Sequence, residues 1–488
     1  MKFVKPIISV LALLVLVKIV FLFPFFHSLE YKASDAMFRF RGVQPVSDSL
    51  IIVSIDDETF NALNETWPFP RNYHAKLIYN LTRAGVKQIV FDVEFTENSD
   101  PENDRILGES ALASNRVIFA GKVINATKLG EPSQMLQPIS SIMQHELPWG
   151  IVNMNADSDG FIRKYTLFEL FDNNPIYSLG IISLAQLQDG QSDKASINLN
   201  HPQKLKINSQ QIPIIEHNSA LINFYGPEGT FRKVSYSSIL DDSTTAMPGY
   251  FGEELNEYYN ILNSGVLKDK IALIGATVDE LHDKFPTPYG GDWTSGVEIH
   301  ANFLEMVKNG NYLTMLNPFL NFLIEFLLAL CLWYLFKAKK PQISAFAAIF
   351  AIFAVFTASY LSFVYGNIVI HIVQVIILII LIFVASILIH YLQTLKEKRF
   401  IRSAFQQYMA PELVAKLLSD PQNLKYGGSL QEVSVLFSDI RSFTTYSESH
   451  TPAETVEILR EYLTEMVKII INNQGILDKF VGDEVMAL

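Results

Sequence analysis

Four stretches of the chain are long and apolar enough to cross a lipid bilayer. A membrane-spanning helix needs about 20 apolar residues to cross a hydrocarbon core about 30 Å thick. The stretches cover residues 7–26, 319–336, 343–364 and 368–389. The first is longer than the apolar part of a secretory signal peptide, and no small-residue cleavage site follows it closely, so we interpret it as a retained anchor. The sequence therefore predicts a multi-pass membrane protein.

The composition agrees with membrane spans joined to water-soluble domains. The 488 residues are 49% hydrophobic and only 18% charged, with a net charge of −12. Soluble proteins carry roughly 25% charged residues. This balance excludes a disordered chain and a polybasic nucleic-acid binder, so we expect no nucleic-acid partner. The single cysteine, Cys331, excludes an intrachain disulfide and a cysteine-ligated zinc site.

Basic residues flank the spans unevenly, and this predicts their orientation. Cationic loops stay in the cytoplasm, and the turn at residues 365–367 has no basic residue. We therefore expect the N-terminus and everything after residue 392 in the cytoplasm, and residues 28–316 outside, for a protein of the cell (inner) membrane. The basic residues that indicate this are Lys2, Lys5, Lys337, Lys339, Lys340, Lys396, Lys398, Arg399 and Arg402.

Several polar residues lie within the apolar stretches. They are Lys18, Glu325, His371 and Gln374. An intramembrane acid or histidine can mark an ion path. Helix packing or a position near the interface is the alternative.

The region between the first two spans, residues 28–316, has the pattern of a folded α/β domain. Residues 49–57 form an apolar run rich in β-branched residues, which predicts a buried strand. Residues 74–95 predict a helix, a stop at Gly85 and a strand. Residues 268–277 predict another strand, and residues 296–310 an amphipathic helix. Strands that alternate with helices predict a sheet covered by helices.

Seven motifs follow one another through this α/β region. They are WPFPR (67–71), FDVEF (91–95), DSDGFIRKY (157–165), NFYGPEGTF (223–231), IALIGAT (271–277), HDKFPTPYG (282–290) and GVEIHANF (296–303). In their order and spacing the region resembles the second family of CHASE extracellular sensor domains. The resemblance implies reception of a periplasmic or extracellular signal, whose ligand stays unknown.

Local chemistry in the α/β region does not name that ligand. Asp56, Asp57, Asp92 and Glu94 come at expected strand ends, where carboxylates can line a cleft. Solubility at strand ends and loop hydrogen bonds are the favoured explanation for these acids. Two further groups stay open: Arg71 with His74, as an anion site or a helix start, and His282 with Asp283 and Lys284.

A helical segment follows the last span. Residues 394–420 have high helix propensity and an apolar stripe, interrupted by Pro411. Such a segment can form a parallel dimer stalk that transmits motion from the membrane to an effector. A plain amphipathic linker is the alternative.

A strand, a helix and a hairpin are expected near the C-terminal end. Residues 433–437 alternate as in a strand. Thr451, Pro452 and Glu454 give an N-cap, a first-turn proline and a third-position acid, which indicate a helix start. Residues 476–488 then predict a hairpin.

Two acids in this part are expected to lie close together. Asp439 ends the strand and Asp483 lies in the hairpin turn. Like charges placed this close need a cation, and Mg²⁺ prefers one or two protein carboxylates together with substrate phosphates. The alternative is that both acids are ordinary turn residues without a metal-binding role.

The motifs FSDIRSFT (437–444) and DKFVGDEVMA (478–487) resemble the two metal motifs of the class III nucleotidyl cyclases. The resemblance implies two divalent cations, Mg²⁺ or Mn²⁺, held by Asp439, the carbonyl of Ile440 and Asp483. It implies attack of the ribose 3′-hydroxyl of ATP on the α-phosphorus, giving 3′,5′-cyclic AMP and pyrophosphate. It also implies a homodimer, joined through the linker and the cyclase domain.

The same resemblance assigns substrate contacts. The backbone N–H groups of Phe443 and Thr444 would meet the phosphates, and Lys479 holds the family's purine-selecting position. Lysine only donates hydrogen bonds, and adenine N1 accepts while guanine N1 carries a proton. Lys479 therefore favours ATP.

The resemblance also sets an expectation for the end of the chain. A complete class III domain continues well over a hundred residues beyond the second acid, so we expect a fragment or truncated product that would not cyclise ATP. A non-catalytic membrane sensor with a cyclase remnant is the alternative, and a downstream NxxxR-like pair would favour the enzyme. A diguanylate cyclase is disfavoured because VGDEV departs from GGDEF.

The sequence thus predicts a multi-domain membrane protein. Its parts are an α/β extracellular sensor, four transmembrane helices that contact membrane lipid, and the start of an α+β, ferredoxin-like class III cyclase domain. The expected boundaries are 1–27 for the anchor, 28–316 for the sensor, 317–392 for three further helices, 393–430 for the linker and 431–488 for the incomplete cyclase domain.

Overall fold

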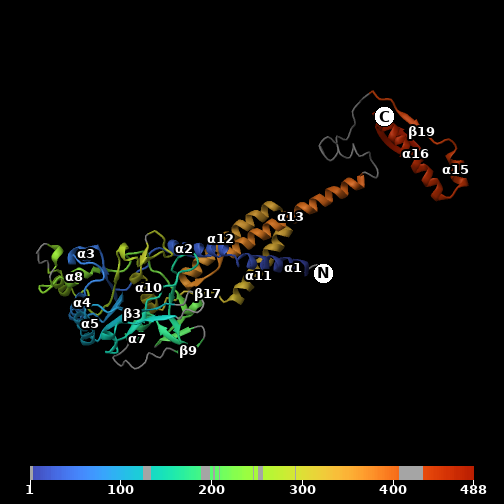
Figure 1. Cartoon of the computed structure of the whole chain (residues 1–488). Coiled ribbons are helices and arrows are strands. Elements are labelled where there is room, and N and C mark those ends of the chain that lie inside the picture. Colours follow the sequence, from blue (N-terminus) through green and yellow to red (C-terminus); the bar gives the residue numbers. More distant parts are fainter. Residues whose placement is uncertain are drawn as a thin grey trace. The chain divides into compact units, whose positions relative to one another are not determined.

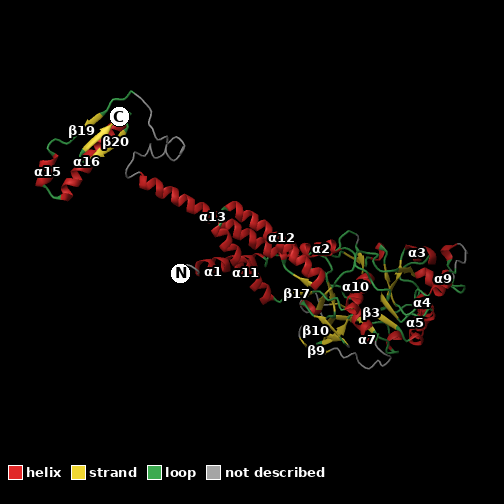
Figure 2. Ribbon diagram, turned by 180° about the vertical axis from the view of Figure 1, so that it is seen from behind, coloured by secondary structure: helices red, strands yellow, loops and turns green. Residues whose placement is uncertain are grey.

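The structure, a computed structural model, divides the chain into two compact units. They are Met1–Phe383 and Val384–Leu488, and each is described by itself. Figure 1 and Figure 2 label their elements. The described residues are 4–124, 133–187, 198–201, 204–207, 209–245, 247–250, 256–291, 293–405 and 432–488.

A seven-stranded sheet forms the core of the α/β region. Its order is β13–β1–β14–β2–β3–β4, and β5 also pairs with β3. The pairs are parallel except β3–β4, which is antiparallel. The strands are β1 (Leu50–Ile55), β2 (Gln88–Glu94), β3 (Val117–Ile124), β4 (Gln134–Leu136), β5 (Trp149–Ile151), β13 (Lys233–Ser235) and β14 (Ile271–Ala276).

Helices cover both faces of this sheet, as the alternating strands and helices predict. Ile51 and Val53 of β1 pack on one face, and Leu50 and Ile52 pack on the other. Every residue of β1 and β14 is buried, which is typical of parallel strands covered on both sides. The first face is covered by α3 (Asp57–Leu63), α4 (Arg71–Arg83), α5 (Pro101–Ser114) and α8 (Tyr236–Leu240), and the second by α7 (Leu179–Gln186) and α10 (Gly296–Asn309).

Smaller sheets and two membrane-side helices form a second core. Met37 and Phe38 of α2 pack there with Phe303 of α10 and Phe363 of α12. The smaller sheets pair β6 (Lys164–Thr166) with β12 (Ser219–Leu221), β7 (Phe168–Phe171) with β8 (Asn174–Tyr177), β10 (Lys204–Ile207) with β9 (Asn198–His201) and β11 (Gln210–Pro213), and β15 (Lys284–Phe285) with β16 (Thr294–Ser295). The short helices α6 (Ser140–Met143) and α9 (Glu257–Ser264) instead pack on the first face of the large sheet.

Three helices within the described residues are long and apolar enough to cross a membrane. They are α11 (Pro318–Ala338), α12 (Pro341–Gly366) and the segment Ile372–Ile401 of α13 (Ile372–Phe405). Both views show them beside α1 (Val4–Val20) (Figures 1 and 2). A fourth span exists only if α1 and α2 (Pro24–Arg41), joined at a bend of 90°, count as one.

The first and last of the expected spans differ from the helices observed. The stretch at residues 7–26 is broken after Val20, and Pro24 opens the next helix because proline favours the first helical turn. The last helix begins at Ile372 because Ile368–Val369 form a short strand, β18. That strand pairs in parallel with β17 (Thr314–Met315).

Helix α13 continues past the apolar segment to Phe405. The expected linker helix at residues 394–420 is therefore confirmed over its first part. Pro411 and the rest of that segment lie outside the described residues, so the choice between a dimer stalk and a plain linker stays a prediction.

The C-terminal unit contains the strand, helix and hairpin expected from its sequence (Figure 2). Thr451 and Glu454 form a capping box at the start of α16, as their spacing predicts. Strand β21 lies between β19 and β20, and both pairs are antiparallel. The elements are β19 (Leu436–Ser438), α15 (Phe443–Ser449), α16 (Pro452–Asn472), β20 (Leu477–Val481) and β21 (Glu484–Ala487).

Candidate functional site

Strand pairing brings the two expected metal-binding acids together. Ser438 at the end of β19 pairs with Val485 at the start of β21. Asp439 follows Ser438, and Asp483 lies two positions before Val485 in the β20–β21 turn. Gly482 precedes it with φ +66°, a conformation that glycine adopts without strain. The sheet register therefore places both carboxylates at one edge.

The two carboxyl groups are close enough to share a hydrogen bond, which raises the pKa of Asp439 above its ordinary value. Slight burial and the charge of Asp483 act in the same direction. The backbone N–H of Ile440 donates to Asp439 Oδ1 at 3.0 Å and opposes the shift. A cation between the carboxylates would relieve their repulsion.

The donor set fits a cation that takes its other ligands from a substrate. The described residues contain no cluster of three or more His, Cys, Asp or Glu side chains that could hold a metal by themselves. Mg²⁺ is usually bound by one or two carboxylates plus phosphate oxygens and water. Asp439 and Asp483 supply that number of carboxylates.

The expected backbone ligands lie beside the acids but contact each other. The N–H of Phe443 donates to the carbonyl of Ile440 at 3.2 Å. That carbonyl keeps a second lone pair for a cation. Thr444 lies in the first turn of α15, where N–H groups lack helical partners. The sequence motifs did not indicate the Ile440–Phe443 bond.

Lys479 lies on β20, in the same hairpin as Asp483. It pairs across the hairpin with Met486. Its side chain is 62% exposed, and its ammonium lies 3.6 Å from the carboxylate of Asp478. Lys479 is thus held near the acids by the backbone and is accessible to a ligand.

Of the acids expected at strand ends in the α/β region, only some share a cavity. Asp92, Glu94, His282 and Asp283 line one cavity of about 470 Å³. Asp56 instead caps α3, because its carboxylate accepts from the N–H of Thr59 at 3.0 Å. Asp57 belongs to the exposed first turn of that helix, so for these two acids the structure favours the explanation by loop and helix-end contacts.

Arg71 and His74 have structural partners rather than a shared anion site. Arg71 lies 2.9 Å from Asp104 and donates to the carbonyl of Glu97. His74 is fully buried, and its Nδ1 lies 2.8 Å from the hydroxyl of Tyr236. Burial lowers the pKa of His74 to about 3, so the ring is neutral.

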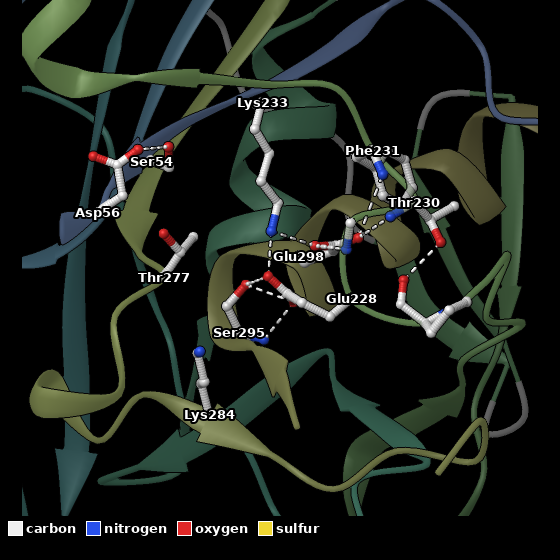
Figure 3. Close-up of polar contacts among 12 residues, drawn as sticks. Ser54, Asp56, Glu228, Thr230, Phe231, Lys233, Thr277, Lys284, Ser295 and Glu298 are labelled. Carbon is white, nitrogen blue, oxygen red and sulfur yellow. Dashed lines mark hydrogen bonds and ion pairs between the residues drawn. The ribbon is translucent and has the colours of Figure 1, made fainter. Parts of the chain in front are cut away.

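A buried carboxylate that sequence reasoning missed organises the start of α10. Glu298 is fully buried and accepts from the N–H groups of Gly229, Thr230 and Phe231 at 3.0, 2.8 and 3.3 Å. Lys233 lies 3.1 Å from it (Figure 3). These contacts connect the motifs NFYGPEGTF and GVEIHANF. The presence of both motifs was therefore the sequence signal that could have indicated the contacts of Glu298.

A neighbouring acid, Glu228, belongs to the same group. It accepts from the N–H of Ser295 at 2.9 Å and is paired with Lys233 (Figure 3). Glu228 and Lys284 also line a second cavity, of about 650 Å³, with Trp293. Figure 3 shows Asp56 apart from this group, bonded to Ser54.

Comparison with known families gives two matches. The family model described as "CHASE2 domain" matches residues 10–337, about two thirds of the chain. The model described as "Adenylate and Guanylate cyclase catalytic domain" matches residues 426–488. No solved structure matches the chain significantly.

The curated relatives listed next each match less than a fifth of this chain. The protein "Adenylate cyclase" of Anabaena cylindrica is 35% identical over 92 residues, which cover 19% of this chain and 17% of the relative. "Adenylate cyclase 1" of Rhizobium meliloti is 36% identical over 87 residues, 17% of this chain and 13% of the relative. "Adenylate cyclase, terminal-differentiation specific" of Dictyostelium discoideum is 32% identical over 91 residues, which cover 18% of this chain and 4% of the relative. The chain thus spans less than a fifth of each relative.

Proposed function

The chain belongs to the CHASE2 domain family and joins that domain to an adenylate and guanylate cyclase catalytic domain; from this we propose that it is a membrane-bound sensor adenylate cyclase. It converts ATP to 3′,5′-cyclic AMP and pyrophosphate in response to a signal outside the cytoplasm. The observation that carries the proposal is the contact between Asp439 and Asp483 at one edge of the β19–β21–β20 sheet.

In this proposal Asp439, the carbonyl of Ile440 and Asp483 hold two divalent cations, Mg²⁺ or Mn²⁺. Bound cations of this kind acidify the ribose 3′-hydroxyl and neutralise charge on the triphosphate. The raised pKa of Asp439 supports this role, because two carboxylates in contact have a strong need for positive charge.

The remaining residues bind and select the nucleotide. Phe443 and Thr444 present N–H groups to the phosphates at the start of α15. The N–H of Phe443 now donates to Ile440, so phosphate binding has to share or replace that bond. Lys479 donates to adenine N1, and its exposure supports access to the base.

The active form proposed here is a homodimer in which each site is shared. Asp439 and Asp483 come from one protomer and Lys479 from its partner, and the linker helix joins the two. Helix α13, which continues unbroken from the membrane segment to Phe405, supports such a coupling.

We further propose four spans in the cell (inner) membrane, with the N-terminus inside. The proposed segments are the anchor (1–27), the sensor (28–316), three further helices (317–392), the linker (393–430) and the cyclase part (431–488). The cyclase part folds as part of a ferredoxin-like domain. The uneven placement of lysine and arginine supports this topology.

A cyclase assay in membranes, on the protein carrying a complete catalytic domain, tests the proposal. With ATP and GTP offered in parallel, wild-type protein should prefer ATP, and Asp439→Ala should lower turnover by about 100-fold or more. Lys479→Glu should weaken the preference for ATP. Glu465→Gln is the control, because this acid is 61% exposed, pairs with Lys468 on α16 and has no assigned role. Unchanged turnover in Asp439→Ala would remove the metal assignment.

A further inference from the structure

The cavity of about 470 Å³ in the α/β region is lined by three carboxylates, those of Asp92, Glu94 and Asp283, and by the single lysine Lys122 among the described residues. It opens at the carboxyl ends of β2 and β14, the edge where α/β sheets bind ligands. We propose that it binds a small organic cation with a protonated amine, held between the carboxylates of Asp92 and Asp283. This inference rests on the proposed sensor role of the α/β region. Because ligand binding is measured directly, its test does not depend on cyclase activity.

Two buried polar atoms face this cavity without a partner. Asp92 Oδ2 and His300 Nε2 have no hydrogen-bond partner within the described part of the chain. The Asp92 side chain is 7% exposed and that of His300 is 2% exposed. Buried carboxylate oxygens are costly to leave unpaired, so a donor from outside the chain is the expected partner.

The short hydrogen bond of His300 is made by Nδ1. The hydroxyl of Tyr165 accepts from the N–H of Gly180 at 3.0 Å and lies 2.5 Å from His300 Nδ1. Burial raises the pKa of Tyr165, so the phenol keeps its proton and donates it to Nδ1. The other ring nitrogen, Nε2, lies 3.5 Å from Asp92 Oδ1, which is too far for a good hydrogen bond. His300 therefore gives Asp92 no short hydrogen bond.

Asp283 is fixed beside Asp92 by the start of α10. Its carbonyl accepts from the N–H of Gly296 at 2.9 Å. A Cβ placed on Gly296 would lie 2.7 Å from Asp283 Oδ2, so glycine leaves the room that this carboxylate occupies. Burial and the charge of Asp92 raise the pKa of Asp283 to about 8.

The other charged groups around Asp283 do not balance the two aspartates. Glu94 adds a negative charge, and Lys122 lies 3.4 Å from Glu94. Trp67 and Phe285 line the same cavity as apolar walls. A cation with an apolar body fits this lining, because aromatic faces attract cations. An organic cation is favoured over a metal, because the described residues contain no cluster of three metal-binding side chains.

The test is calorimetric titration of the full-length protein in detergent with benzylammonium chloride. Above pH 8, where Asp283 is ionised, we expect binding to wild-type protein and at least tenfold weaker binding to Asp92→Asn and to Asp283→Asn. Benzyl alcohol, which has the same ring without the charge, should not bind. Asp279→Asn is the matched control, because this carboxylate is 84% exposed and pairs with Lys284.

Two further measurements keep the proposal testable if a variant folds poorly. Thermal unfolding without ligand identifies variants that retain the fold. In wild-type protein the affinity for benzylammonium should rise as the pH passes through 8, because Asp283 loses its proton, and Asp283→Asn should lose that rise. Absence of binding, equal binding of benzyl alcohol, or full affinity in Asp92→Asn would overturn the proposal. So would displacement of the probe by calcium chloride at equimolar concentration.

Discussion

His74 shows how strongly one buried ring depends on its surroundings. It is 1% exposed and bonded to the Tyr236 hydroxyl, and its pKa is lowered to about 3 by burial and then by the charge of Arg71. In the unfolded chain the same ring takes up a proton near its ordinary pKa of 6.5. Below that pH the unfolded state binds more protons than the folded state, so stability falls as the pH falls.

We therefore predict that acid weakens the sensor region through His74. Between pH 7 and pH 4 this one group should lower the free energy of unfolding by about 3 kcal/mol. The measurement is urea unfolding followed by tryptophan fluorescence at both pH values. His74→Gln should reduce the pH dependence by that amount, whereas exposed His217→Gln should leave it unchanged. Equal pH dependence in wild type and His74→Gln would contradict the assignment.

For single residues, the sequence predicted the positions of the acidic side chains better than it predicted the residues that they contact. Asp439 and Asp483 could be placed because a strand end and a hairpin turn have defined positions in the backbone. Asp92 and Asp283 could not be paired, because they are far apart in sequence and meet only when α10 packs against β14. The bond between Ile440 and Phe443 depends on loop geometry that a motif does not specify.

Arg163 shows how single side chains join whole elements. Its guanidinium makes two bonds of 2.8 Å to Asp35 of α2, and its Nη1 lies 3.0 and 2.8 Å from Asp157 and Asp159. The side chains of Arg163 and Asp35 are each 7% exposed. The motif DSDGFIRKY thereby anchors the helix α2, which follows the first membrane helix, to the sensor region.

Removing this anchor should be costly. Arg163→Met removes the ion-pair partner of Asp35 and Asp159, whereas Asp157 keeps Lys164 at 2.9 Å, so we predict a loss of about 3–5 kcal/mol in the free energy of unfolding. Arg163→Lys should recover only part of this stability, because lysine cannot make the two parallel hydrogen bonds that the guanidinium makes to Asp35. Arg105→Met is the control, since Arg105 is 50% exposed and solvent screens its ion pairs, so this variant should lose little stability. Equal losses in both arginine variants, measured by chemical unfolding, would refute this.

The polar residues of the membrane helices form a network. The Lys18 ammonium of α1 lies 2.9 Å from Glu325 of α11 and donates to Gln374 of α13 at 2.7 Å. Asn321 also donates to Glu325, at 2.8 Å. These contacts support helix packing, one of the two explanations that the sequence left open.

Breaking one side of this ion pair should therefore destabilise the helix bundle. We predict that Lys18→Met lowers stability by about 2–3 kcal/mol, because Glu325 is left charged in an apolar setting. The double variant Lys18→Met, Glu325→Gln should be more stable than the single variant. Thermal unfolding of detergent-solubilised protein measures both. A double variant that loses the sum of the two single losses would argue against a direct pair.

Elements with strong local signals were predictable, and those that depend on neighbours were not. The buried strands β1 and β14 follow from their unbroken aliphatic runs, and α16 follows from its capping box. The start of α13 was wrong because Ile368–Val369 pair with a strand that follows α10, a contact that apolar content cannot reveal. The sequence shows that Lys18 and Glu325 lie in apolar stretches, but not that their helices pack together.

For the whole molecule, helix α13 is notable because it continues unbroken past its apolar segment to Phe405. Two residues inserted into a helix turn everything after them by about 200°, whereas seven change the phase by only about 20°. We predict that two alanines inserted after Thr394 change basal cyclase activity by about 5-fold or more, and that seven do not. Membrane cyclase assays compare the two insertions. Equal activity in both would show that helical phase does not matter.

The account as a whole rests on nucleotide cyclisation at Asp439 and Asp483. Its most direct test is to incubate purified protein carrying a complete catalytic domain with ATP and Mg²⁺, and to quantify 3′,5′-cyclic AMP and pyrophosphate by mass spectrometry. We predict equal amounts of both products from wild-type protein and about a hundredfold less from Asp483→Asn. The account would be contradicted if wild-type protein formed no cyclic nucleotide, or if Asp483→Asn formed it at the wild-type rate.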